Sequence, residues 1–136
     1  MVQPINHDPI TLGRRSLPAS PEDASTGQDL LDTLQAHEAE CVGMAANMIG
    51  VHKRIIAVND EGTYRLMYNP EIIKKSGNYE TEEGCLSLPG VRKTARWKTI
   101  KVRFLNENFS LRIKTFTGFT AQIIQHEIDH CDGVLI

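Results

Sequence analysis

Two segments near the C-terminus, 98–105 and 109–116, show the alternation of apolar and polar residues that is typical of strands with one face toward a core. They are joined by Asn106-Glu107-Asn108, a composition that favours a turn. We therefore expect an antiparallel hairpin here. The apolar residues that share one face are Ile100, Val102 and Phe104 in the first strand and Leu111 and Ile113 in the second.

Further short apolar segments earlier in the chain predict more strands. Residues 54–59 and 63–69 are expected to pair through the turn Asp60-Glu61-Gly62. Residues 79–83 alternate and are expected to form another short strand, after a stretch interrupted by Pro70 and by Ser76-Gly77-Asn78.

Helical spacing appears at both ends of the chain. Gly118 should end the last strand, and residues 119–132 carry Ile124, Ile128 and Cys131 at helical intervals. Nearer the N-terminus a helix should start at Ser20-Pro21 or at Thr26-Gly27 and end before Gly43, with an apolar stripe of Leu30, Leu31, Leu34 and Cys41. The proline-rich segment 1–19 is expected to be an extended arm over the surface. The pattern predicts an α+β fold in which antiparallel β-sheets enclose a C-terminal helix, with another helix near the N-terminus.

Composition limits the number of domains, the possible partners and the cellular compartment, but it does not indicate a reaction. A chain of 136 residues is expected to form a single domain, 1–136. The formal net charge of -2 predicts neither a nucleic-acid partner nor a membrane surface, and no apolar run approaches the roughly 20 residues of a membrane span. Three widely spaced cysteines argue against a disulfide framework, so we expect a cytoplasmic protein. The oligomeric state is not predicted.

The sequence His126-Glu127-Ile128-Asp129-His130 predicts a metal site on the C-terminal helix. Residues four apart lie one turn above each other, so His126 and His130 can bind one cation, while Glu127 is rotated away and suits a general base. A solvated helix face that happens to carry these residues is the structural alternative, and a zinc peptidase is a third reading of the helix motif alone. Cys85 is the strongest candidate for a further ligand, because Gly84 and Pro89 indicate a rigid segment outside a strand ladder. Cys41 and Cys131 are expected to be ordinary apolar side chains.

Three motifs resemble the signatures of the peptide deformylases: Gly43-Met44-Ala45-Ala46, Glu83-Gly84-Cys85-Leu86-Ser87-Leu88-Pro89 and Gln125-His126-Glu127-Ile128-Asp129-His130. The resemblance implies an α+β fold in which the sheets enclose the metal-binding helix. It also implies removal of the formyl group from N-formylmethionyl peptides or nascent chains, in bacteria and organelles. It implies one divalent metal ion, Fe(II) first, with Zn, Ni or Co as substitutes. The implied metal ligands are Cys85, His126 and His130, the implied general acid and base is Glu127, and the backbone amide of Leu86 would help to hold the oxyanion. Val42, Gly43, Arg92 and Ile123 would lie near the substrate.

The first motif departs from the family pattern. Active members carry Gly where this chain has Cys41 and Gln where it has Met48. Because a thioether cannot donate the hydrogen bond that the glutamine gives to the oxyanion, we expect reduced activity, and we do not expect the neighbouring Asn47 to substitute. The alternative is a weak or inactive paralogue that binds metal and N-terminal peptides. The chain stops directly after the metal helix, so ribosome docking is not expected.

Overall fold

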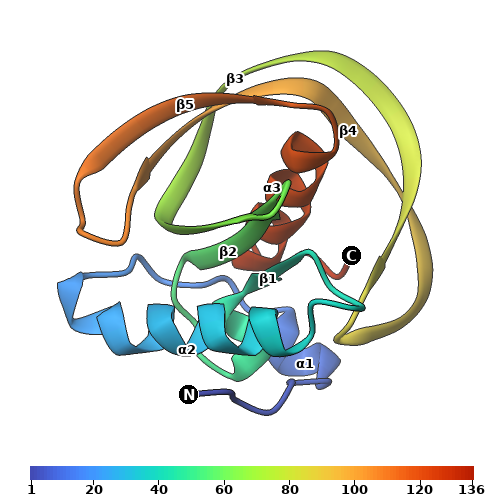
Figure 1. Cartoon of the computed structure of the whole chain (residues 1–136). Coiled ribbons are helices and arrows are strands. Elements are labelled where there is room, and N and C mark those ends of the chain that lie inside the picture. Colours follow the sequence, from blue (N-terminus) through green and yellow to red (C-terminus); the bar gives the residue numbers. More distant parts are fainter.

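The computed structural model describes residues 1–136 and contains one antiparallel sheet with strand order β1-β2-β3-β4-β5. The strands are β1 (Gly43–Ala45), β2 (Ile55–Asp60), β3 (Thr63–Cys85), β4 (Leu88–Leu105) and β5 (Leu111–Thr117). The helices are α1 (Pro9–Leu12), α2 (Ala24–Ala36) and α3 (Gly118–Cys131), with short 3-10 helices η1 (Pro21–Asp23) and η2 (Ala46–Ile49). The α+β class, the C-terminal helix and the N-terminal helix are confirmed, with one strongly curved sheet around α3 (Figure 1).

Strand β2 is buried on both faces because a helix covers each side of it. Ile56 and Val58 pack in the cluster that contains α3, while Ile55 and Ala57 pack in the cluster that contains α2. Alternate residues of a strand point to opposite faces, so the continuous apolar run of β2 is what a strand between two helices requires. In Figure 1 α3 lies inside the curve of the sheet and α2 runs across the other side of β1 and β2.

Strands β3 and β4 are much longer than the sequence pattern predicts, and they arch around α3 (Figure 1). Residues 79–83, expected as a separate short strand, are part of β3. The expected interruption at residues 76–78 is absent because Gly77 adopts φ +76 and lets the strand continue. Register irregularities between Tyr68 and Glu71, where Pro70 lies, bend the strand without ending it.

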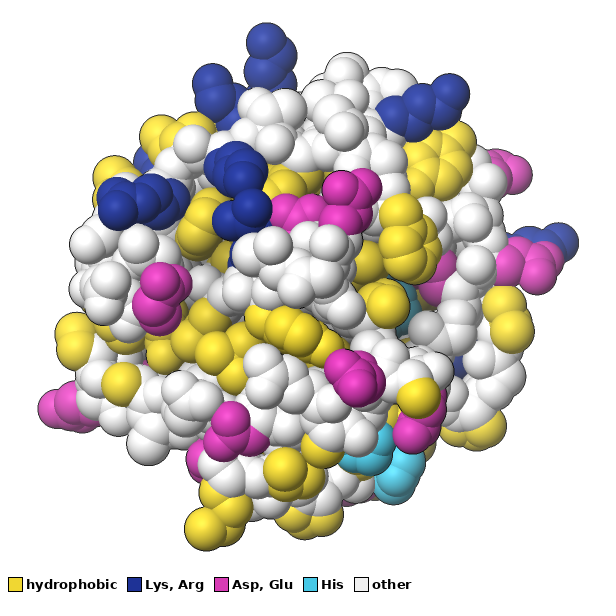
Figure 2. Space-filling model, in the orientation of Figure 1, with side chains coloured by type: hydrophobic (Ala, Val, Ile, Leu, Met, Phe, Trp, Pro, Cys, Tyr) yellow, Lys and Arg dark blue, Asp and Glu magenta, His cyan; other side chains and the backbone are white.

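The register between β4 and β5 decides which face each apolar residue occupies. Val102 pairs with Lys114 and Ile100 with Phe116, so the inner face of β5 holds Phe116. Leu111 and Ile113 do share a face, but it is the outer one, where their side chains are 59% and 52% exposed. Figure 2 shows Lys and Arg side chains over this upper region of the molecule, where Figure 1 places β3, β4 and β5.

The N-terminal arm runs over the surface but contains a short helix and contributes Leu12 to the core, which corrects the expectation of a purely extended segment. Asp8 caps α1 by accepting a hydrogen bond from the backbone N–H of Ile10 (3.1 Å), and Pro9 opens the helix. This turn places Leu12 in the core with no exposed surface. The arm is also held by the N–H of Asn6, which donates to the carbonyl of Met48 (2.7 Å).

Helix α2 follows the Ser20 start, since Ser20 and Asp23 form a capping box on η1 and α2 continues directly from it. Leu30 and Leu34 are fully buried, as expected. The helix ends at Ala36, so Cys41 does not belong to its apolar stripe and lies in the connection to β1. None of the helices combines the length and the apolar character that crossing a bilayer requires.

Candidate active site

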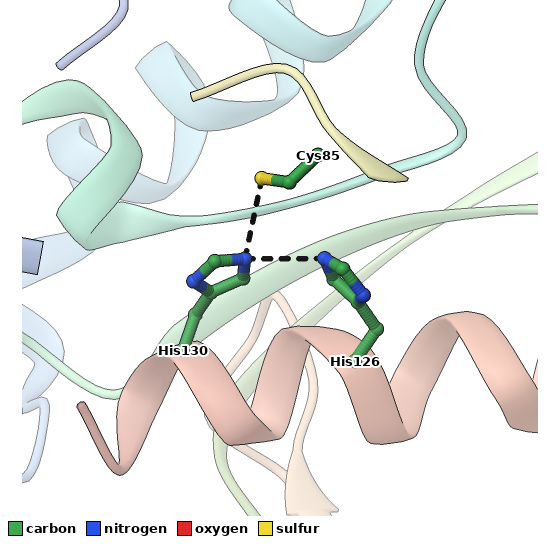
Figure 3. A group of neighbouring side chains, drawn as sticks. All are labelled: Cys85, His126 and His130. Carbon is green, nitrogen blue, oxygen red and sulfur yellow. Dashed lines mark hydrogen bonds between the residues drawn. The ribbon is translucent and has the colours of Figure 1, made fainter. Parts of the chain in front are cut away.

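Cys85, His126 and His130 converge in space although the cysteine is about 40 residues from the histidines in the chain (Figure 3). Nε2 of His126 lies 3.1 Å from Nε2 of His130, and Sγ of Cys85 lies 3.4 Å from the latter. All three candidate ligand atoms lie within 4.8 Å of one another. Ligands at about 2.0–2.3 Å from one tetrahedral ion would be separated by roughly 3.3–3.7 Å, so the three side chains fit a shared metal ion.

Cys85 is the last residue of β3 and pairs with Leu88 across the turn Leu86-Ser87. It therefore lies at the end of a strand ladder, which corrects the expectation of a segment outside any ladder. The register irregularity at Gly84 precedes it. The short hairpin turn still holds the thiol in a fixed position, because strand pairing fixes the backbone on both sides of it.

A buried network of charged side chains binds the Nδ1 atom of His126, the ring nitrogen that is not a candidate ligand atom. Oε1 of Glu83 accepts a hydrogen bond from Nδ1 of His126 (2.8 Å), while Nη2 and Nε of Arg96 donate to the two oxygens of the same carboxylate (2.7 and 2.9 Å). Gln122 donates to Glu83 (2.9 Å), and Nη1 of Arg96 reaches Asp129 (2.7 Å). Burial raises the pKa of Glu83, but the hydrogen bonds from His126 and Arg96 outweigh it and lower the pKa to about 2. The anionic Glu83 thus fixes the tautomer that leaves Nε2 of His126 free as a ligand atom.

Arg96 and Gln122 are members of this network that sequence reasoning did not name as site residues. Arg96 lies in β4, 13 residues after Glu83 in the chain, and its Cα partner in β3 is Tyr79, whereas Glu83 pairs with Arg92. Its long side chain reaches Glu83 on the neighbouring strand. Arg96 and Glu83 meet because of the register of β3 against β4, and no local sequence motif predicts this contact.

Glu127 is buried at 4% exposure, and its Oε1 has no hydrogen-bond partner in the protein. Burial raises its pKa to about 7, which places the carboxyl between its two protonation states near neutral pH. Gly43 is required next to it, because a Cβ on Gly43 would lie 2.9 Å from Oε2 of Glu127 and 2.6 Å from Cγ2 of Ile123. The free oxygen and the absent side chain together leave room for another molecule.

Positions 47 and 48 point in different directions. Asn47 is buried, and its Nδ2 donates to the backbone carbonyl of His130 (3.0 Å), so its amide is engaged behind the ligands. Met48 lines the cavity in front of them. The structure thus supports the expectation that Asn47 does not take the place of the family glutamine.

A cavity of about 870 Å³ opens in front of Cys85, His126 and Glu127. Its lining includes Leu86, Val42, Gly43 and Ile123, all named from the sequence, together with residues that sequence reasoning did not name as site residues: His7, Glu40, Phe119 and Gln122. Cys41, expected to be an ordinary apolar residue, also lines it. Arg92 lies outside this lining, where its Nη1 donates to the carbonyl of Pro89 (3.3 Å).

Comparison of the sequence with known proteins identifies a family that matches nearly the whole chain. Residues 5–136 match the family model described as polypeptide deformylase. The chain is 51% identical over 136 residues to a peptide deformylase of Clostridium beijerinckii, covering 100% of both chains, and 42% identical over 111 residues to peptide deformylase 1 of Clostridium perfringens, covering 79% of this chain and 74% of that one.

Solved structures agree with this match. The structure of peptide deformylase from Thermus thermophilus shares a TM-score of 0.87 and 34% identity, over 99% of this chain and 84% of that one. A structure of the class I type b enzyme from Acinetobacter baumannii with Met-Ala-Ser bound shares a TM-score of 0.88 and 29% identity, over 99% and 97%. The chain therefore belongs to the polypeptide deformylase family, a family of metal-dependent hydrolases.

Proposed function

We propose that this chain removes the formyl group from N-formylmethionyl peptides, with Cys85, His126 and His130 holding one metal ion and Glu127 acting as general base and acid. The observation that carries the proposal is the juxtaposition of three convergent ligand atoms with the unpartnered, buried Oε1 of Glu127 at one cavity. A purely structural metal site has no need of such a carboxylate.

The donor set also argues for the kind of metal. One thiolate and two imidazoles suit Fe(II), Zn, Ni or Co better than Mg or Ca, and we favour Fe(II) as the native ion. When bound, the ion would act as a Lewis acid that lowers the pKa of water, so that a nucleophile for the formamide is available near neutral pH. The three cysteines are unpaired, which fits a reducing compartment such as the cytoplasm.

Glu127 performs the proton transfers in this proposal. Its carboxylate accepts a proton from the attacking water and returns it to the nitrogen that leaves when the C–N bond breaks, giving formate and a free amino terminus. Burial raises the pKa of Glu127, which brings the protonated form needed to return the proton to the leaving nitrogen closer to neutral pH.

The peptide is proposed to lie along β1, which is one of the two edge strands of the sheet. Val42, Gly43 and Ile123 line the cavity beside it, and the N–H of Leu86 in the turn after Cys85 would donate to the oxyanion. Arg92, outside the cavity lining, would meet only parts of the peptide that extend beyond it.

Met48 favours a second candidate function. Met48 is a lining residue of the cavity at the position where active relatives carry glutamine, and its thioether cannot donate, so the oxyanion would lack one hydrogen bond. The loss of one such donor typically lowers the rate by about 10²- to 10³-fold. The second candidate is therefore a weak or inactive paralogue that binds metal and N-terminal peptides.

The two functions are separated by one pair of measurements on anaerobically prepared, Fe(II)-loaded protein. Formate release from formyl-Met-Ala-Ser supports the hydrolase, provided that Glu127→Gln abolishes it and Glu80→Gln, at an exposed position, does not. Calorimetric binding of the product peptide Met-Ala-Ser without formate release supports the paralogue. If the protein neither binds Met-Ala-Ser nor releases formate, both proposed functions are wrong.

A further inference from the structure

The free edge of β1 presents the backbone of Gly43 to the cavity. The N–H of Asn59 in β2 donates to the carbonyl of Val42 (2.8 Å), and Gly43 lies opposite Val58. Hydrogen-bonded and non-hydrogen-bonded pairs alternate in an antiparallel ladder, so the N–H and C=O of Gly43 point away from β2. They point toward the side where β1 has no neighbouring strand and where Gly43 lines the cavity.

The carbonyl of Gly43 already has an internal partner. The thiol of Cys41 donates to it, with Sγ 2.9 Å from the oxygen. Burial raises the pKa of Cys41 to about 12, so the sulfur keeps its proton at neutral pH and remains a donor. Cys41 lines the same cavity, which means that the contact lies on the surface a peptide would approach.

We propose that Cys41 lowers the affinity for peptides, because its thiol competes with the peptide backbone for the carbonyl of Gly43. An incoming peptide that adds a strand to β1 must displace this hydrogen bond before its own N–H can bind the same oxygen. The inference rests on the proposed function, since it assumes a peptide on β1. Cys41 stands where active relatives have glycine, and the inference assigns weaker peptide binding to this difference.

The expected size of the effect follows from the type of contact. A single hydrogen bond that is exchanged on binding corresponds to about 2- to 10-fold in affinity, with a thiol near the lower end because it is a weak donor. The contact is lost equally in the bound ground state and in the transition state, so it should appear in KM and leave kcat unchanged.

Two substitutions at one position provide the test on the Fe(II)-loaded protein. Cys41→Ala removes the donor and should lower KM for formyl-Met-Ala-Ser by about 2- to 5-fold at constant kcat. Cys41→Ser keeps a donor of similar size and should give a KM equal to or above that of the unmodified protein. An unchanged KM in Cys41→Ala, or an equal fall of KM in both variants, would overturn the inference.

Methylated peptides make the test atom-specific. A set of formyl-Met-Ala-Ser peptides, each N-methylated at one backbone amide, should include one for which Cys41→Ala no longer lowers KM, because that peptide lacks the competing N–H. If the difference persists for every peptide in the set, competition for the Gly43 carbonyl is wrong.

Binding of Met-Ala-Ser separates failure of this inference from failure of the proposed function. If no variant releases formate, a Kd that is tighter in Cys41→Ala and not in Cys41→Ser still supports competition at Gly43 while the hydrolase assignment fails. An unchanged Kd in Cys41→Ala overturns the inference whether or not the protein is active.

Discussion

Arg96 and Glu83 form a two-pronged ion pair between β4 and β3, with Nη2 2.7 Å from Oε1 and Nε 2.9 Å from Oε2. Their side chains are 5% and 6% exposed, and the same carboxylate holds Nδ1 of His126. The pair therefore joins the stability of the long hairpin to the orientation of a proposed metal ligand.

Removing one partner of this pair should be strongly destabilising. Arg96→Met leaves the Glu83 carboxylate buried without its cation, and we expect a loss of about 3–5 kcal/mol in the free energy of unfolding. Chemical denaturation measures this loss. The control is Arg103→Met, which breaks a pair with Glu71 whose side chains are 49% and 60% exposed and should cost less than about 1 kcal/mol. Equal effects in the two variants would show that the buried pair contributes no more than a surface contact.

Metal content tests the proposed ligand set directly. Cys85→Ala removes the thiolate and should abolish stoichiometric Fe(II) or Zn binding, measured by elemental analysis after gel filtration. Cys41→Ala, in the same cavity, should retain one metal ion per chain. Full occupancy in Cys85→Ala would exclude this cysteine as a ligand.

Position 48 should control the rate and leave the metal in place. Met48→Gln introduces the missing donor at the cavity wall, and we expect kcat for a formyl-Met peptide to rise, by up to about 10²- to 10³-fold. Met48→Leu has a similar volume without a donor and should leave kcat near its starting value. If glutamine and leucine give the same kcat, the oxyanion does not depend on this position.

Gly27 is the fourth residue of α2, inside the helix, where alanine normally stabilises the structure. Here a Cβ would lie 2.0 Å from the hydroxyl oxygen of Tyr68, whose ring is buried. We therefore expect Gly27→Ala to lower the thermal midpoint, with a cost of about 1–3 kcal/mol from overpacking. Ser25→Ala, exposed in the same helix, should not lower it. Adding Tyr68→Phe, which removes the clashing oxygen, should recover part of the loss.

His7 connects the N-terminal arm to the turn after Cys85. Nδ1 of His7 lies 3.0 Å from the carbonyl of Ser87, so this nitrogen is the donor. We expect His7→Ala to lower kcat about 3- to 10-fold by releasing a turn that carries the amide of Leu86. His7→Asn, whose amide nitrogen can replace Nδ1, should restore kcat, whereas His7→Gln should not. Identical kcat values in all three variants would show that the contact has no role in positioning the turn.

Some features of the site were readable from the sequence because they are local. His126 and His130 meet because helical geometry sets residues four apart on one face, and Ile56 and Val58 share a face because a strand alternates. The class of fold agreed with what the motifs implied. Val42, Gly43 and Ile123 line the cavity, and their contact with a substrate stays a prediction.

The remaining features depend on contacts between distant parts of the chain, which no local period encodes. The register of β3 against β4 brings Arg96 to Glu83, and the register of β4 against β5 turns Ile113 outward. Packing of the N-terminal arm buries Leu12 and carries His7 to the cavity. By itself, the sequence determined which residues are candidates for the metal ligands and the general base, because their chemistry and spacing are intrinsic to short segments. Only the tertiary structure decided what surrounds them, because a one-residue change in strand register exchanges the two faces of a sheet.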